Sequence, residues 1–193
     1  MKSHIINVLD LELSCYPDGV FPPGEQKEII EVGLATLNLR TRTIVRTISM
    51  PVIPTMSRIS PFCTALTGWT EAKLRRQGMP MGEVCRLLAE KHGALNRLLA
   101  TDTSGDPEFF LSQCRLMGIA FPFGPERLNV STLFALLTGE MKNLGLALML
   151  EKVGLTFEGL PHRGDNDARN IARLLLKLIE NSSFPLADEG GTR

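Results

Sequence analysis

Two carboxylates, Asp10 and Glu12, stand two positions apart at the end of an apolar run that begins at Ile5. Side chains two positions apart in a strand share one face of a sheet, so both carboxylates would leave the sheet together. Carboxylates this close repel each other, and a divalent cation such as Mg²⁺ or Mn²⁺ relieves the repulsion through the oxygen ligands it prefers. The pair indicates a metal site, and the alternative is a strand that has simply reached solvent.

A third carboxylate, Asp167, lies in the first turn of a helix predicted for residues 165–181, four positions before Ile171. This spacing aligns it with the buried stripe of the helix, and a carboxylate that points inward needs a partner. The alternative is that it favours the positive end of the helix dipole, but that explanation fits Asp165 better, since Asp165 can cap the helix. His162 stands five positions earlier, where its imidazole could swing over whatever Asp167 binds.

The fourth acid of such a site is Asp106 or Asp102. Asp106 precedes Pro107, and an Asp cap followed by Pro at the first helical position is ordinary chemistry for a helix start. A capping carboxylate keeps one oxygen free for a metal-bound water, so this role does not exclude catalysis. Asp102 lies at the end of a strand predicted for residues 96–101 and is the alternative.

The charge balance limits the partners that the chain can have. Its 21 basic residues equal its 21 acidic residues, which argues against a strongly basic protein that coats nucleic acid. A local basic rim around an acidic site remains compatible with a nucleic-acid substrate. No pair of the four cysteines has CxxC spacing, which argues against a zinc or redox motif.

The length of 193 residues predicts one globular domain with a single core. The apolar stretches are far shorter than the roughly 20 residues that a membrane-spanning helix needs, so no membrane partner is expected. The apolar run from Ile5 is stopped by Asp10 and Glu12, so no secretory signal is expected either. We therefore expect a cytoplasmic protein in which all four cysteines are reduced thiols.

The elements that must position these side chains are three strands, and then helices interleaved with a further strand over residues 96–101. Strands are predicted over residues 5–13, 29–39 and 42–53, and the last two form an antiparallel hairpin. Helices are predicted over residues 60–67, 70–77, 81–92, 107–117, 131–138, 144–153 and 165–181. The fold class is therefore α/β, with a mixed sheet flanked by helices. Residues 1–181 form the predicted domain, and residues 182–193 form a mobile polar tail.

The segments around the acids resemble the DEDDh exonucleases, the DnaQ-like branch of the ribonuclease-H-like superfamily. Residues 7–12, NVLDLE, match the first motif of that family, and residues 162–172, HRGDNDARNIA, match the third. The most similar subgroup contains the histone-mRNA 3′ exonucleases and the bacterial KapD-like proteins. The segments that support it are IIEVG at 29–33, FCTALTG at 62–68 and FEG at 157–159. The resemblance spans about residues 5–180 and implies a ribonuclease-H-like sheet.

The sequence departs from the family pattern at three places. The second motif usually reads aromatic-Gly-x-x-Asp; counting back from Cys114 places its Asp at Asp106, and Asp102 takes the position of the aromatic residue. Asn166 stands where the third motif commonly has another Asp. Trp69 replaces the Ile of the usual Thr-Gly-Ile, at the end of the site that holds the terminal base.

The resemblance implies hydrolysis of phosphodiesters from the 3′ end of a single strand, releasing nucleoside 5′-monophosphates with two Mg²⁺ or Mn²⁺ ions. Asp10 would bridge both ions, Glu12 and Asp167 would hold the ion that activates water, and Asp106 would hold the other. His162 would be the general base, since an imidazole titrates near neutral pH.

The substrate side is also given by resemblance. Leu11, Leu66 and Thr67 would contact the terminal nucleotide. Phe62 or Trp69 could stack on a base, although Phe62 could instead pack in the core. Two arginines flank the third motif and could meet phosphates, Arg163 and Arg169.

The partner is then a single-stranded RNA or DNA 3′ end, and subgroup likeness favours RNA. A DNA exonuclease of the proofreading or repair type shares the same metal site and is the alternative. A non-catalytic nucleic-acid-binding protein on this fold would be expected to lack one of the carboxylates or the histidine, and all five positions are filled.

Overall fold

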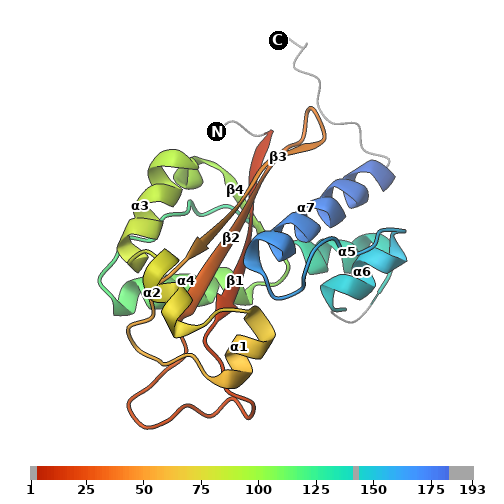
Figure 1. The fold of residues 1–193 in the computed structure, drawn as a ribbon. Helices are drawn as coiled ribbons and strands as arrows, with labels where there is room; N and C mark the ends of the chain where they lie inside the picture. Colours follow the sequence, from red (N-terminus) through yellow and green to blue (C-terminus); the bar gives the residue numbers. More distant parts are fainter. Residues whose placement is uncertain (1–3, 141–143, 183–193) are drawn as a thin grey trace.

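A mixed five-stranded sheet forms the centre of the computed structural model, which describes residues 4–140 and 144–182 (Figure 1). The strand order is β3-β2-β1-β4-β5, and β4 and β5 run parallel to β1, whereas β1, β2 and β3 form an antiparallel meander. The strands are β1 (Ile5–Leu13), β2 (Ile29–Asn38), β3 (Thr43–Pro51), β4 (Leu98–Thr101) and β5 (Arg127–Asn129). The predicted α/β fold class is confirmed.

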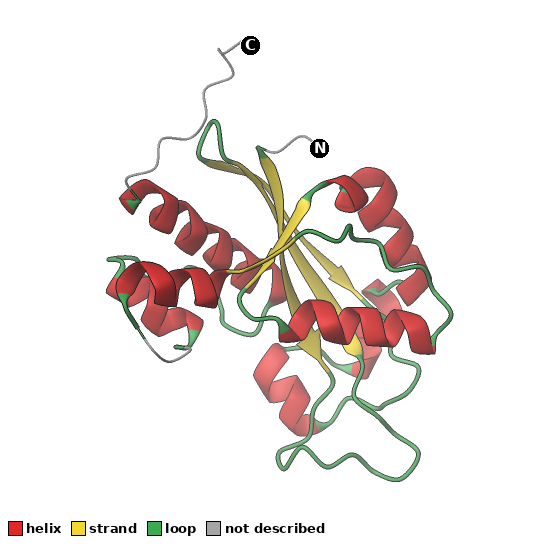
Figure 2. Ribbon diagram, turned by 180° about the vertical axis from the view of Figure 1, so that it is seen from behind, coloured by secondary structure: helices red, strands yellow, loops and turns green. Residues whose placement is uncertain are grey.

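Helices cover both faces of the sheet, as the view from behind also shows (Figure 2). They are α1 (Pro61–Thr67), α2 (Glu71–Gln77), α3 (Met81–Lys91), α4 (Gly105–Leu116), α5 (Val130–Thr138), α6 (Leu146–Lys152) and α7 (Gly164–Asn181). Their caps follow the sequence: the hydroxyl of Ser60 accepts a hydrogen bond from the backbone of Cys63, and Gly68 ends α1 in the left-handed conformation. Of the predicted tail, only Ser182 lies within the described residues.

Two predicted helix starts are wrong. Helix α4 begins at Gly105 after the N-cap Ser104, so Asp106 lies inside the first turn and is not the cap. Helix α7 begins at Gly164 after the N-cap Arg163, so Asp165 does not cap it. Strand β5 and a 3₁₀ turn at Ala94–Asn96 were not predicted, because three residues are too few to show a period.

Alternation along the strands divides the interior into two cores. Leu9 and Leu34 pack on the face covered by α3 and α4, with Phe110 of α4 at the centre of that core. Val8 and Ala35 pack on the other face, against α5, α6 and α7. The buried side of α7 carries the apolar residues predicted for it, Ile171, Leu174, Leu175 and Leu178. Asp10 and Glu12, which follow Val8 at two-residue spacing, therefore leave β1 on the face that α7 covers.

Helix α7 reaches this face through a backbone contact at Gly33 of β2. A Cβ atom on Gly33 would lie 1.8 Å from the carbonyl oxygen of Gly164, so only glycine fits there. Gly33 is the register partner of Asp10 in β1. The contact thus holds the first turn of α7 beside the carboxyl end of β1.

Within the described residues, no helix is both long and apolar enough to cross a lipid bilayer. The four cysteines all carry free thiols. Two of them, Cys85 of α3 and Cys114 of α4, lie with their Sγ atoms 3.8 Å apart in the core between these helices.

Candidate active site

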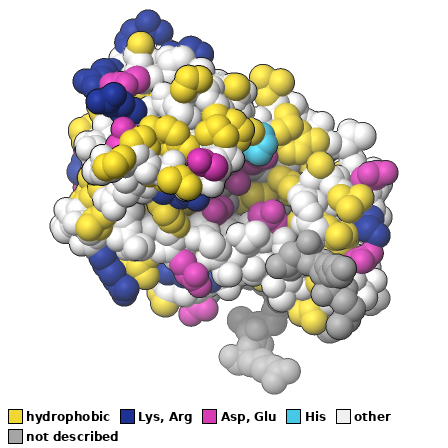
Figure 3. All heavy atoms as spheres, turned by 90° about the horizontal axis from the view of Figure 1, so that it is seen from below, with side chains coloured by type: hydrophobic (Ala, Val, Ile, Leu, Met, Phe, Trp, Pro, Cys, Tyr) yellow, Lys and Arg dark blue, Asp and Glu magenta, His cyan; other side chains and the backbone are white. Residues whose placement is uncertain are grey.

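Three carboxylates from opposite ends of the chain meet where β1 ends. Asp10, Glu12 and Asp167 each place an oxygen within 4.8 Å of the others. Asp10 and Glu12 come from β1, and Asp167 comes from the first turn of α7. Seen from this end of the sheet, acidic side chains gather near the centre of the surface, and a histidine lies beside them (Figure 3).

Burial and mutual repulsion dominate the electrostatics of these groups. Burial raises the pKa of Asp10 well above its usual range, and the charges of Asp106, Glu12 and Asp167 raise it further. Burial, followed by the charge of Asp167, raises the pKa of Glu12 to about 8. Arg163 opposes this shift, but it does not balance the negative charge. Such a cluster favours binding of a cation.

Asp167 is half-buried, and this partial burial raises its pKa to about 6. The backbone N–H of Arg163 donates to its Oδ2 at 3.0 Å, which favours the charged form and limits the shift. This hydrogen bond uses one carboxylate oxygen and orients the side chain. An oxygen of the same carboxylate lies within 4.8 Å of oxygens of Asp10 and Glu12.

The fourth acid comes from the start of α4. Asp106 lies outside the tight group of three, yet its charge is the largest carboxylate contribution to the pKa of Asp10. Burial and the charge of Asp102 raise the pKa of Asp106 itself to about 7. Asp102 is engaged elsewhere, because the hydroxyl of Ser131 donates to its Oδ1 at 2.5 Å and the Ser131 backbone donates to its carbonyl oxygen at 3.1 Å. Geometry therefore favours Asp106 over Asp102 as the fourth ligand.

His162 is exposed at the rim, and its charge acts on Asp167. Its backbone has a φ of 60°, in the left-handed region that few non-glycine residues adopt. The loop before it is tied to α7 by Asn170, whose side chain accepts from the backbone of Glu158 at 3.0 Å and donates back to its carbonyl at 2.9 Å. These hydrogen bonds hold the loop that carries His162 against α7, on the side of Asp167.

The donor set itself fits a divalent cation. It consists of carboxylate oxygens alone, which hard cations such as Mg²⁺ and Mn²⁺ prefer over softer metals. The negative charge of these carboxylates exceeds the positive charge of the groups around them. Asp10, Glu12 and Asp167 could hold one cation directly, with Asp106 beside it.

Residues 8–175 match the model of a protein family described as Exonuclease, RNase_T. The chain belongs to this exonuclease family. The matched range begins just before Asp10 and extends beyond Asp167, so it includes every acid of the cluster.

Relatives of known name are similar over the whole exonuclease domain. The chain is 30% identical to human 3'-5' exoribonuclease 1 over 185 residues, covering 91% of this chain and 52% of the human protein. It spans about half the length of the curated relatives it matches.

Two solved structures share the fold at 29% identity. The nuclease domain of 3'hExo, a DEDDh family member bound to rAMP, superposes with a TM-score of 0.82 over 93% of this chain and 94% of that one. A 3'-exonuclease in specific recognition of a histone mRNA stem-loop superposes with a TM-score of 0.81, over 93% and 65%.

The predicted substrate contacts are distributed unevenly over the surface and the core. Phe62 is 41% exposed and Leu66 is also exposed, so the core packing considered for Phe62 is wrong and its ring is open to a base. Trp69 is 4% exposed and lies in a small core with Ile30, so its predicted stacking on a base is wrong. The packing of α1 and α2 decides which aromatic ring is buried.

The remaining predicted contacts are less open. Leu11 and Thr67 are buried, and the Thr67 hydroxyl donates to the Cys63 carbonyl and accepts from the Trp69 backbone. Arg163 lies next to the cluster, where its charge acts on Glu12. Arg169 instead pairs with Glu158 at 3.1 Å on the outer side of α7.

One buried residue beside the site was given no function from the sequence. Glu31 lies opposite Glu12 in the β1–β2 register and is fully buried. Its oxygens accept hydrogen bonds from Ser49, Trp69 and the backbone of Gly164. The sequence signal that could have revealed it is a carboxylate inside a strand that is predicted to be buried. Such a carboxylate, on the same face of the sheet as Glu12, needs a partner.

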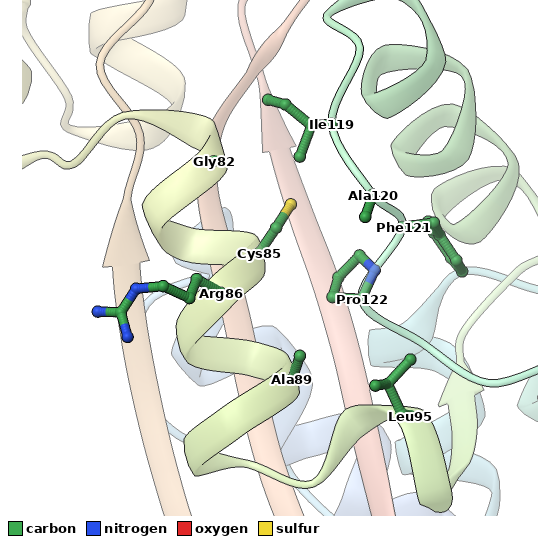
Figure 4. Close-up of a pocket in the computed structure, with 9 residues that line it drawn as sticks. All are labelled: Gly82, Cys85, Arg86, Ala89, Leu95, Ile119, Ala120, Phe121 and Pro122. Carbon is green, nitrogen blue, oxygen red and sulfur yellow. The ribbon is translucent and has the colours of Figure 1, made fainter.

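A cavity of about 330 Å³ lies away from the acids, between α3 and residues 119–122 (Figure 4). Apolar side chains such as Leu95, Ile119 and Phe121 line it, together with Cys85 and Arg86. It belongs to the face of the sheet opposite α7 and holds no carboxylate.

Proposed function

We propose that this chain is a divalent-cation-dependent 3′–5′ exonuclease that removes nucleoside 5′-monophosphates from single-stranded 3′ ends, with RNA as its preferred substrate. The observation that carries the proposal is the meeting of Asp10, Glu12 and Asp167 within 4.8 Å, at a site where burial and repulsion disfavour their charged forms. Without a cation this arrangement costs stability. A catalytic role gives this costly arrangement a purpose.

Two ions of Mg²⁺ or Mn²⁺ are proposed, held by Asp10, Glu12 and Asp167 with Asp106 at the second position. When bound, such ions stabilise negative charge on the phosphate and lower the pKa of water. Asp10 is central because the charges of all the other acids reach it. Asp167 keeps its orientation through the hydrogen bond from the Arg163 backbone.

His162 is proposed as the general base. Its exposed imidazole would accept the proton of the attacking water and pass it to solvent, while the carboxylates below remain charged. The lone pair that accepts the proton must face the site, and this orientation depends on the φ of 60° at His162. Its position beside Asp167 would also stabilise the imidazolium that forms.

The proposed preference for RNA is supported by the relatives. The human relative is named an exoribonuclease, and the two solved neighbours are described with rAMP and with a histone mRNA stem-loop. Discrimination from DNA would require a contact to the 2′-hydroxyl of the terminal nucleotide. The exposed Phe62 and Leu66 would pack against its base.

The test is an end-labelled degradation assay. The protein is incubated with 5′-labelled RNA and DNA single strands of equal sequence, with Mg²⁺, with Mn²⁺ or with chelator. We expect a ladder that shortens from the 3′ end only with a divalent ion, and faster on RNA. Asp10→Asn should abolish it, and His162→Ala should slow it by roughly 10²–10⁴-fold.

Three outcomes would overturn parts of this proposal. Equal activity in chelator and in Mg²⁺ would exclude the metal mechanism, and tight RNA binding without cleavage would favour the non-catalytic alternative. Faster degradation of DNA would favour the DNA exonuclease. Arg86→Met, on α3 and away from the acids, serves as a control that should keep full activity.

A further inference from the structure

We propose that Trp69 and Arg163 are positioning residues, which together with Glu31 fix the backbone from His162 to Gly164 and so set where the general base stands. This inference rests on the proposed function, because it assigns the cluster to the same reaction. Trp69 is buried, and Arg163 contributes through its stem and guanidinium, so neither role requires contact with the reacting atoms.

Glu31 is the buried acceptor at the centre of the cluster. The indole N–H of Trp69 donates to its Oε2 at 2.7 Å, the Gly164 backbone donates to the same oxygen at 3.3 Å, and the Ser49 hydroxyl donates to Oε1 at 2.5 Å. The guanidinium of Arg163 lies 3.6 Å from Oε1. A buried carboxylate holds its partners firmly, because losing one leaves charge unpaired in the interior.

The Arg163 guanidinium also lies over the Trp69 ring, 4.9 Å from its centroid. Within the described residues, the Nε atom of Arg163 is buried without a hydrogen-bond partner. Attraction between the cation and the ring face offsets that loss only while the two groups stay stacked. Trp69 and Glu31 therefore fix the Arg163 side chain from two sides.

The backbone that carries this side chain is the part that matters for catalysis. His162 adopts a φ of 60°, and the N–H of Arg163 donates to Asp167. A non-glycine residue in the left-handed region relaxes unless its surroundings hold it. The Arg163 side chain and the Gly164–Gly33 contact, which both lie directly after the strained residue, provide that restraint.

Trp69 also connects this segment to the substrate side of the site. It follows Gly68 at the end of α1, and its backbone donates to the Thr67 hydroxyl at 3.1 Å. The same short helix presents Phe62 and Leu66 to solvent. A shift in the Trp69–Arg163 stack would therefore move the base-contacting helix relative to His162.

The first experiment measures single-turnover rates for Trp69→Phe, Arg163→Met and the control Arg86→Met, each in the native and His162→Ala backgrounds. With His162 present, we expect the two cluster variants to lower the maximal rate by about 10- to 100-fold, with little change in KM. With His162 removed, the same substitutions should lower it by less than about 3-fold, since the base whose position they set is then absent. Arg86→Met should be silent in both.

The outcomes separate positioning from two simpler roles. Equal losses in both backgrounds would show a merely structural effect and overturn the proposal. A raised KM for Arg163→Met alone, with Trp69→Phe unaffected, would show that Arg163 is only a phosphate contact. Arg163→Lys, which keeps the charge, should recover part of the rate if the ion pair with Glu31 contributes.

The second experiment does not depend on activity. Hydrogen–deuterium exchange of residues 159–167 should accelerate at least about 10-fold in Trp69→Phe and Arg163→Met, whereas exchange in α4 should stay unchanged. Trp69 is the single tryptophan of the chain, so loss of the stack in Arg163→Met should also alter intrinsic fluorescence. Unchanged exchange in this segment would overturn the inference even if the protein is a nuclease. Accelerated exchange in an inactive protein would refute only the proposed function.

Discussion

At the residue scale, the site lowers the stability of the metal-free protein, because the protein interior disfavours the charged forms of its carboxylates. Glu12, Asp106 and Asp167 have pKa values raised to about 8, 7 and 6, from ordinary values of 4.5, 3.8 and 3.8. Burial is the leading cause for each, followed by another carboxylate for Glu12 and Asp106. The metal-free protein therefore folds most favourably with these groups protonated.

This predicts how stability depends on pH in chelator. Because the folded pKa values exceed the unfolded ones, the stabilisation is fully present below about pH 4 and is lost as pH rises through 6 to 8. The melting temperature in chelator should fall between pH 5 and pH 8, and Mg²⁺ should restore it most at pH 8. Differential scanning calorimetry with and without Mg²⁺ measures both effects.

The substitution Asp10→Asn gives the matched control. It removes one buried charge without changing the shape of the side chain, so it should raise the stability of the chelated protein at pH 8 by at least about 1 kcal/mol, or roughly 2–4 °C. The Mg²⁺ response should shrink in the same variant. A chelated Asp10→Asn protein less stable than the native chain would contradict this account.

We expect substitutions of the two acids near α4 to differ in their effects on cleavage and on stability. Asp106→Asn should abolish metal-dependent cleavage, because its charge reaches Asp10 and its side chain is free of the Ser131 contact. Asp102→Asn should lower activity less and should lower stability, since the short hydrogen bond from Ser131 weakens. Cleavage rates and melting temperatures of both variants test this assignment. Loss of cleavage in Asp102→Asn with retention in Asp106→Asn would reverse it.

At the scale of elements, the site depends on how α7 meets β2. A Cβ atom on Gly33 would lie 1.8 Å from the carbonyl oxygen of Gly164. All the nearest atoms that it would meet belong to the backbone, so they cannot rotate away as a side chain could. Helix α7 would have to shift as a body, and Asp167 and the His162 segment would move with it. The close contact thus couples the position of β2 to the positions of Asp167 and His162.

Gly33→Ala should therefore reduce both stability and activity. We expect a loss of about 3 kcal/mol in the free energy of unfolding and a fall in cleavage at temperatures where the variant is still folded. Gly145→Ala is the control, because Gly145 has a φ of −64° and open space around the added methyl. It should change stability by less than about 0.5 kcal/mol. Chemical denaturation curves would settle the comparison, and a Gly33→Ala variant as stable as Gly145→Ala would contradict the packing account.

At the scale of the whole molecule, the strand order explains how distant segments build one site. Strand β1 lies in the middle of the sheet between β2 and β4, so it is flanked by Glu31 of β2 and by the turn that leads from β4 to Asp106. Helix α7 crosses the same end on one face. Residues 10, 31, 106 and 167 therefore converge at one end of the sheet.

The neutral charge of the molecule predicts weak salt dependence of substrate binding. The formal net charge is zero, and the arginines of α7 beyond the site are paired with Glu158. One or two phosphate contacts would give a slope of about −0.7 to −1.4 for log affinity against log salt. Binding of inactive Asp10→Asn to a labelled single strand should weaken only about 3- to 7-fold between 50 and 200 mM NaCl. A slope steeper than about −3 would contradict this expectation, because it would require more phosphate contacts than one or two.

The sequence alone determined the parts of this protein that local rules control. Period-two and period-3.6 patterns predicted three strands and the buried face of α7, because side-chain direction follows directly from backbone geometry. The spacing of Asp10 and Glu12 and the phase of Asp167 predicted a common metal site. The resemblance of the first and third motifs added the family, which the comparisons confirm.

Only the tertiary structure decided which side chains are open and which are buried. Phe62 and Trp69 are both aromatic residues near α1, yet the packing of α1, α2 and β2 buries Trp69 against Glu31 and leaves Phe62 exposed. The helix starts predicted at Asp106 and Asp165 were also wrong, because both helices begin earlier in the chain. A capping residue is a local signal, and it carries no information about the contacts that extend a helix beyond it. Burial depends on neighbours far away in the sequence, and a local pattern carries no information about them.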